Sequence, residues 1–132
     1  MDLRVARHTA RLDEVVGFYR DGIGLTEIGG FHEHDGYDGV FLAVPGTGAH
    51  LELTAGGGHG GPTPDPESLL VFYLGDDEAV QAIAARLGVE PIPSENPWWN
   101  EHGLTFEDPD GFRVVLVPER WELGEGEITA PR

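Results

Sequence analysis

The chain has 132 residues and no cysteine, and its 24 acidic residues against eight basic ones give a formal net charge of −16. This length fits one domain with a buried core, and the lack of cysteine excludes disulfides, thiolate metal ligands and cysteine nucleophiles. The negative charge disfavours nucleic acid and anionic membranes as partners. No segment approaches the roughly 20 apolar residues of a membrane span, and the first residues lack the apolar region of a secretory signal. The sequence therefore predicts a cytoplasmic protein.

The first half of the chain predicts a strand, a helix and three more strands. The segment Leu3–Thr9 contains β-branched residues and opens the series as a strand. Asp13 and Glu14 occupy the first turn of a helix, where acidic residues are favoured, and Gly22 and Gly24 end that helix. The further strands are expected at Leu25–Phe31, Val40–Val44 and His50–Thr54.

The second half repeats this order after a Gly- and Pro-rich linker at residues 55–67. A strand at Leu69–Leu74 precedes a helix at Asp76–Leu87, and Gly88 ends the helix. The remaining strands are expected at Val89–Ile92, Leu104–Glu107 and Phe112–Val117. A Pro-rich loop is expected between the first two of these strands.

The two halves can be aligned with each other. Asp13–Val16 aligns with Asp77–Val80, and Gly39-Val40 aligns with Gly103-Leu104 at the same spacing. Repeats of this length are single supersecondary units that bury a common core by pairing. The prediction is a single α+β domain, residues 1–132, of two tandem βαβββ modules whose curved sheets surround a ligand cavity. The modules are expected at residues 3–54 and 68–117, followed by an acidic tail at 118–132.

Three segments together resemble a known family: Phe18–Leu25, His50–Thr54 and Phe106–Leu116 with its Asp-Pro-Asp-Gly turn. The series resembles the vicinal oxygen chelate superfamily, which includes glyoxalase I, extradiol dioxygenases, fosfomycin-modifying enzymes and bleomycin-resistance proteins. The resemblance covers residues 3 to about 119. It implies the glyoxalase/bleomycin-resistance fold, in which curved sheets enclose a cavity, usually within a dimer.

The resemblance also implies metal ligands on the first and last strands of each module. Those positions fall on Arg4, Glu52, Leu69 and Val115. Only Glu52 can bind a metal, because a guanidinium stays protonated and hydrocarbon side chains offer no lone pair. We therefore predict no catalytic residue, no metal and no cofactor, and we expect the four positions to converge in one cavity.

Side chains alternate along a strand, which predicts the polar residues that face the cavity. Arg4 and Glu52 either form a partly buried ion pair in the vacated metal position or bind a polar edge of a ligand. A mostly apolar wall with a few polar groups is typical of ligand pockets. The predicted ligand-binding residues are Arg4, His8, His50, Glu52, Thr54, Tyr73, Trp98, Trp99, Asn100 and Arg113.

Trp98 and Trp99 are adjacent indoles in the Pro-rich loop, and the backbone directs them to different sides. At least one of them is expected to stack on a planar ligand. The other interpretation is that one caps the core while the other packs on a dimer partner.

The sequence thus favours a non-catalytic protein that confers antibiotic resistance by sequestering a bulky, partly planar drug, as in the antibiotic-binding resistance branch. We expect a homodimer, with the pocket either within one chain or across the dimer interface. The alternative is a metal-dependent glyoxalase- or dioxygenase-type enzyme with relocated ligands at His8, His50 and Glu52. A third possibility is an isomerase or cyclase that uses the cavity without a metal.

Overall fold

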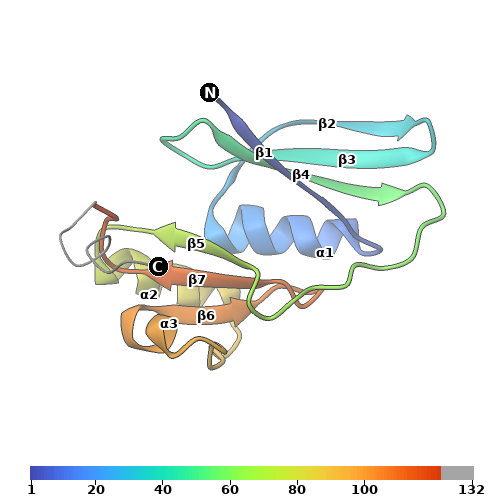
Figure 1. The fold of residues 1–132 in the computed structure, drawn as a ribbon. Helices are drawn as coiled ribbons and strands as arrows, with labels where there is room; N and C mark the ends of the chain where they lie inside the picture. Colours follow the sequence, from blue (N-terminus) through green and yellow to red (C-terminus); the bar gives the residue numbers. More distant parts are fainter. Residues whose placement is uncertain (123–132) are drawn as a thin grey trace.

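Each half of the chain builds one β-sheet, and the two sheets share one hydrophobic core (Figure 1). The structure is a computed structural model that describes residues 1–122. Most of the predicted acidic tail, from residue 123 on, lies outside the described residues. Among residues 1–122, none of the helices is both long and apolar enough to cross a membrane.

The first half forms a four-stranded sheet, here called sheet A. Its elements are β1 (Leu3–His8), α1 (Leu12–Gly17), the π-helical η1 (Phe18–Ile23), β2 (Thr26–His34), β3 (Tyr37–Ala43) and β4 (Ala49–Gly56). The strand order is β1-β4-β3-β2, so the last strand of the half pairs with the first, in parallel. Gly24 adopts a left-handed conformation (φ 97°) that ends η1, as the sequence predicts.

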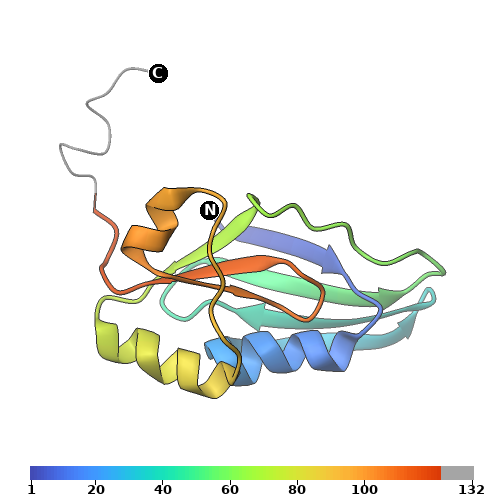
Figure 2. The same cartoon turned by 90° about the horizontal axis from the view of Figure 1, so that it is seen from below.

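The second half forms a three-stranded sheet, sheet B, in the order β5-β7-β6. Its elements are β5 (Leu69–Tyr73), α2 (Asp77–Leu87), α3 (Pro97–His102), β6 (Leu104–Glu107) and β7 (Arg113–Val117). As in sheet A, the first and last strands pair in parallel. Figure 2 shows α1 and α2 along one side of the molecule and α3 on the opposite side. The predicted α+β class is confirmed.

Two local predictions for the second half were wrong. The expected strand Val89–Ile92 reduces to one bridge between Ile92 and Thr105. Pro91 and Pro93 flank Ile92 and have no N–H to donate, so no ladder can extend there. The expected loop around the two tryptophans contains α3, because the Asn96 side chain accepts a hydrogen bond from the Trp98 N–H at 3.0 Å and Pro97 occupies the first turn.

Both sheets contribute one face to the core. Leu51 and Leu53 of β4 and Val114 and Leu116 of β7 are at most 4% exposed and belong to the same cluster. The helices add Val15, Val16, Tyr19, Val80 and Ile83 to it. Because strand side chains alternate, the residues between these positions point away from the core.

A buried polar contact joins the two halves inside this core. Tyr19 is fully buried, and its hydroxyl donates to Asp108 Oδ2 at 2.6 Å. The other carboxylate oxygen accepts the N–H groups of Asp110 and Phe112 at 2.9 and 3.0 Å, which closes the Asp-Pro-Asp-Gly turn. Burial, and then the negative charge of Asp108, raise the pKa of the Tyr19 phenol well above its usual value. Burial also raises the pKa of Asp108, although its hydrogen bonds oppose the shift.

The unfolding free energy should therefore fall as the pH rises above about 10, the ordinary pKa of tyrosine. The unfolded chain releases the Tyr19 proton near that pH, whereas the folded chain keeps it to higher pH, so deprotonation favours unfolding. The chain has no lysine or cysteine and arginine stays charged, so few other groups titrate there. Urea unfolding at alkaline pH should show a slope of up to about 1.4 kcal/mol per pH unit. Tyr19→Phe should reduce the slope, and an unchanged slope would contradict this explanation.

Candidate functional site

Three predicted ligand residues meet on the outer face of sheet A, the face that points away from the core. The parallel register places Arg4 beside His50 and Ala6 beside Glu52. Arg4 Nε donates to His50 Nε2 at 2.8 Å, and Arg4 Nη1 lies 3.7 Å from Glu52 Oε2. The guanidinium also lies 4.8 Å from the centroid of the Phe41 ring. These contacts fix the direction of the Arg4 side chain, whose head can still bind an oxygen of a ligand.

Arg4 and Glu52 form the predicted ion pair, but the pair is more exposed to solvent than the partly buried pair that the sequence predicts for the vacated metal position. The Arg4 side chain is 50% exposed and the Glu52 side chain 19%. An ion pair with one half-exposed partner contributes only about 1 kcal/mol or less to stability. Removing Glu52 should therefore change the unfolding free energy by only about 1 kcal/mol or less.

The outer face also carries aromatic residues that the sequence reasoning missed. Phe41 lies directly across from Glu52 in the β3–β4 ladder, and the Phe31 ring centroid lies 5.9 Å from that of Phe41. The Phe31 ring occupies the space above Gly39, where a larger residue would collide with it. The sequence indicated that side chains alternate between the two faces along residues 37–43. Only the strand register shows that Phe41 lies on the same face of the sheet as Glu52.

His8 and Thr54 lie at the far end of the same face. His8 Nδ1 and Thr54 Oγ1 are 3.3 Å apart. The linker residue His59 returns to this end, where its Nε2 lies 2.8 Å from the Tyr37 hydroxyl and its ring meets the His8 ring edge-on. The face is therefore polar at both ends and aromatic between them.

The residues do not fit a metal ion. His50 Nε2 is already engaged by Arg4, whose fixed positive charge lies at one of the family's ligand positions. Within residues 1–122, no three His, Asp or Glu side chains are grouped so that they could hold a metal. The alternative set of His8, His50 and Glu52 is thus not assembled as a coordination site.

The predicted aromatic residues meet on the other sheet. Tyr73, Trp98 and Trp99 line a pocket of about 380 Å³, here called the α3 pocket. Its other lining residues are His102, Val117, Glu119, Arg120, Trp121 and Glu122. Trp98 stacks on His102 with centroids 3.9 Å apart and remains 50% exposed. All three tryptophans of the chain therefore border one pocket.

Asn100 and Arg113 both have partners within the chain. The Asn100 amide accepts from Ser94 N at 2.8 Å and donates to Ser94 O at 3.2 Å. Arg113 Nη1 contacts Pro93 O at 3.5 Å and lies 4.0 Å from Glu95. Asn100 joins α3 to the segment before it, and Arg113 joins that segment to β7 of sheet B, so both side chains support the α3 pocket from outside its lining.

The two groups of predicted residues do not share a cavity within one chain. Arg4 and Glu52 lie on the outer face of sheet A, whereas Leu69 and Val115 are paired on sheet B. The α3 pocket and four further pockets within residues 1–122 have none of these four residues in their linings. The expectation of one converging cavity fails for a single chain, because both sheets use their other faces for the common core.

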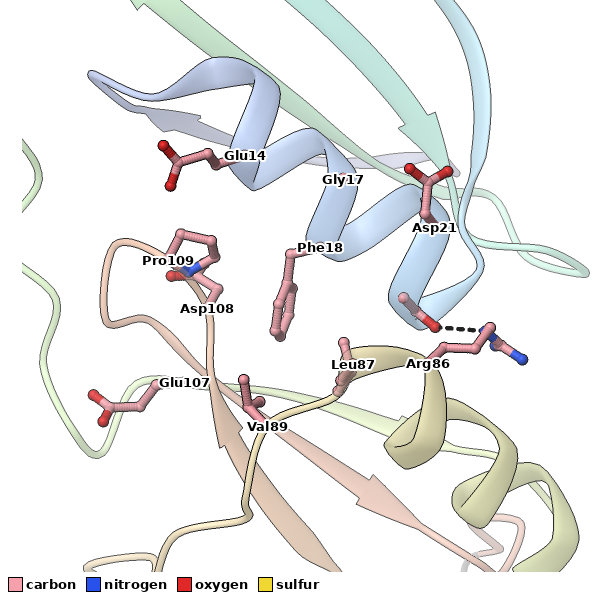
Figure 3. Close-up of a pocket in the computed structure, with 11 residues that line it drawn as sticks. Glu14, Gly17, Phe18, Asp21, Arg86, Leu87, Val89, Glu107, Asp108 and Pro109 are labelled. Carbon is pink, nitrogen blue, oxygen red and sulfur yellow. Dashed lines mark hydrogen bonds between the residues drawn. The ribbon is translucent and has the colours of Figure 1, made fainter.

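A further pocket, which the sequence did not predict, lies where the two halves meet (Figure 3). This junction pocket has a volume of about 490 Å³. It is lined by Glu14, Gly17, Phe18, Asp21, Gly22, Arg86, Leu87, Val89, Glu107, Asp108 and Pro109. Its residues come from three distant segments, so only the packing of η1, α2 and the turn after β6 creates it.

Comparison with known proteins identifies the same relative, YycE, by sequence and by structure. The YycE-like N-terminal domain matches residues 3–54, and the YycE-like C-terminal domain matches residues 67–118. The protein YycE of Bacillus subtilis is 45% identical over 127 residues, which cover 93% of this chain and 91% of YycE. A crystal structure of a Bacillus subtilis YycE protein superposes with a TM-score of 0.85 at 42% identity, covering 93% of each chain.

More distant structures share the fold. Glyoxalase I of Leishmania major has a TM-score of 0.68 at 22% identity, covering 90% of this chain and 86% of its own. The fosfomycin resistance protein FosX of Mesorhizobium loti has a TM-score of 0.65 at 13% identity, covering 86% and 87%. The fold is thus the glyoxalase/bleomycin-resistance fold. The chain belongs to the YycE-like family, within the vicinal oxygen chelate superfamily.

Proposed function

We propose that this protein is a non-catalytic binding protein that sequesters a bulky, partly planar antibiotic. The observation that carries the proposal is the outer face of sheet A, where His50 and Glu52 orient Arg4 above the Phe41 ring. A polar edge beside an aromatic surface is typical of small-molecule sites. Arg4 would bind an oxygen of the drug while Phe41 and Phe31 contact its apolar part.

The α3 pocket supports the same class of ligand. Trp98 is half exposed, so its indole presents surface on which a flat ring can stack. Sequestration needs affinity alone, and binding at about 1 µM corresponds to about −8 kcal/mol. Relatives of the fold that are named as fosfomycin or bleomycin resistance proteins make drug binding a function that this fold supports.

The proposal includes a homodimer. The outer face of sheet A and the α3 pocket both point away from the common core, so a single chain cannot enclose one ligand between them. A two-fold dimer can bring the outer face of sheet A of one protomer against the α3 pocket of its partner. Each dimer would then hold two equivalent sites.

A thermal-denaturation panel of antibiotics tests the ligand class. A bulky aromatic drug such as bleomycin should raise the unfolding midpoint more than fosfomycin does, because only the larger drug can reach both surfaces. Mass spectrometry after incubation should recover the drug unchanged. A modified drug, or stabilisation by fosfomycin alone, would contradict sequestration of a planar ligand.

Glu52→Gln should weaken binding of the stabilising drug about tenfold, the equivalent of about 1.4 kcal/mol. The change removes the carboxylate that helps to orient Arg4, yet the unfolding free energy should change by only about 1 kcal/mol or less. Glu27→Gln is the matched control, because Glu27 pairs with Arg20 at 2.8 Å in an exposed ion pair outside the site. Equal drug affinity in the two variants would contradict the role of Glu52.

Mixing two variants tests whether the site spans the dimer. Arg4→Gln and Trp98→Ala should each weaken binding of the drug. For Trp98→Ala the loss of binding free energy should be roughly 1–3 kcal/mol. A mixed dimer keeps one intact site, with sheet A from one variant and the α3 pocket from the other. Binding should therefore return to about a quarter of the sites after subunit exchange. A monomer in sedimentation at tens of micromolar, or no recovery in a dimer, would contradict the shared site.

A further inference from the structure

The junction pocket has the size and rigidity of a second binding site. Its volume of about 490 Å³ lies within the roughly 300–1,000 Å³ of small-molecule pockets. Arg86 Nε donates to Gly22 O at 3.0 Å, which ties the end of α2 to η1 across the pocket (Figure 3). The hydrogen bonds of Asp108 fix the opposite wall. Walls that are already in place reduce the ordering cost of binding.

The floor of the pocket is apolar and only partly covered. Figure 3 shows the Phe18 ring pointing into the space between η1 and the strand that leads to Asp108. Leu87, Val89 and Pro109 complete this surface, and Val89 is 53% exposed. Covering apolar surface with a ligand removes that surface from water and so favours binding. The floor therefore favours a ligand with a hydrocarbon or aromatic body.

The rim of the pocket is negative, and its charges are separated along it. Glu14 and Glu107 stand on either side of Pro109 at one end, whereas Arg86 and Asp21 stand at the other end (Figure 3). In the described part of the chain, the Glu14 side chain has only a loose partner, Arg11, at 3.9 Å. Within residues 1–122, Glu107 has no hydrogen bond or ion pair through its side chain. The end near Pro109 thus holds carboxylates that a ligand can neutralise.

We propose that the junction pocket binds an amphipathic organic cation of the arylalkylammonium class. The aromatic body packs on Phe18 and Val89, and the ammonium group lies at the Pro109 end, where the carboxylates of Glu107 and Glu14 attract it. The same carboxylates repel carboxylate and phosphate ligands. This site is separate from the outer face of sheet A, so a ligand here leaves Arg4 free for the proposed drug.

Titration with phenethylammonium, followed by backbone amide NMR, tests the site. Shifts should cluster at residues 14–22, 86–89 and 107–109, and binding should weaken as sodium chloride is raised. Phenethyl alcohol has the same body without the charge and should bind more weakly. Phenylacetate, which reverses the charge, should bind most weakly of the three.

Two variants test the negative rim and the apolar floor of the junction pocket separately. Glu107→Gln should weaken phenethylammonium binding roughly two- to fivefold and leave phenethyl alcohol unchanged. Val89→Ser should weaken both compounds, and its exposure means that the fold is retained, which the unfolding midpoint verifies. Glu101→Gln, on the exposed surface of α3, is the control and should change neither. Shifts that map elsewhere, equal affinity for phenylacetate, or a Glu107→Gln variant that matches Glu101→Gln would overturn the proposal.

Discussion

The hydrogen bond between Tyr19 and Asp108 is the contact on which the arrangement of the two halves depends. Most contacts between the halves are apolar, and apolar packing has no preferred direction. The Tyr19 hydroxyl instead meets one carboxylate oxygen at 2.6 Å, while the other oxygen closes the turn after β6. Neither group can turn to water, because both residues are buried. The bond therefore adds a directional contact to the apolar packing of the two halves, at the wall of the junction pocket that Asp108 lines.

The two proposed sites differ in local charge although the chain as a whole is strongly acidic. The outer face of sheet A presents the Arg4 guanidinium over aromatic rings, whereas the junction pocket presents carboxylates over an apolar floor. Local charge decides which ligand is accepted, since exposed charges farther than about 10 Å are screened by salt. Under the two proposals, one small domain would discriminate between two chemical classes of ligand on its two sides.

The sequence predicted the elements that local signals control. Glycines and the internal repeat marked most helices and strands, but the Val89–Ile92 segment was assigned by its apolar residues although its prolines forbid a ladder. Alternation along β1 and β4 found Arg4, His50 and Glu52, which do meet. Phe41 needed the strand register, and the junction pocket needed the packing of distant segments. The contacts of Asn100 with Ser94 and of Arg113 with Pro93 could not be predicted from local pattern either.

The parallel pairing of first and last strands constrains how the chain can fold during synthesis. The four strands of sheet A can pair completely only after β4 has left the ribosome, because β4 is the strand that pairs with β1. Its inner face stays uncovered for longer, because Val114 and Leu116 complete the same core more than 50 residues later. A nascent chain of the first half alone therefore exposes apolar surface and an open strand edge, both of which invite aggregation. The Gly- and Pro-rich linker serves as a tether that keeps the second half at high local concentration until it docks.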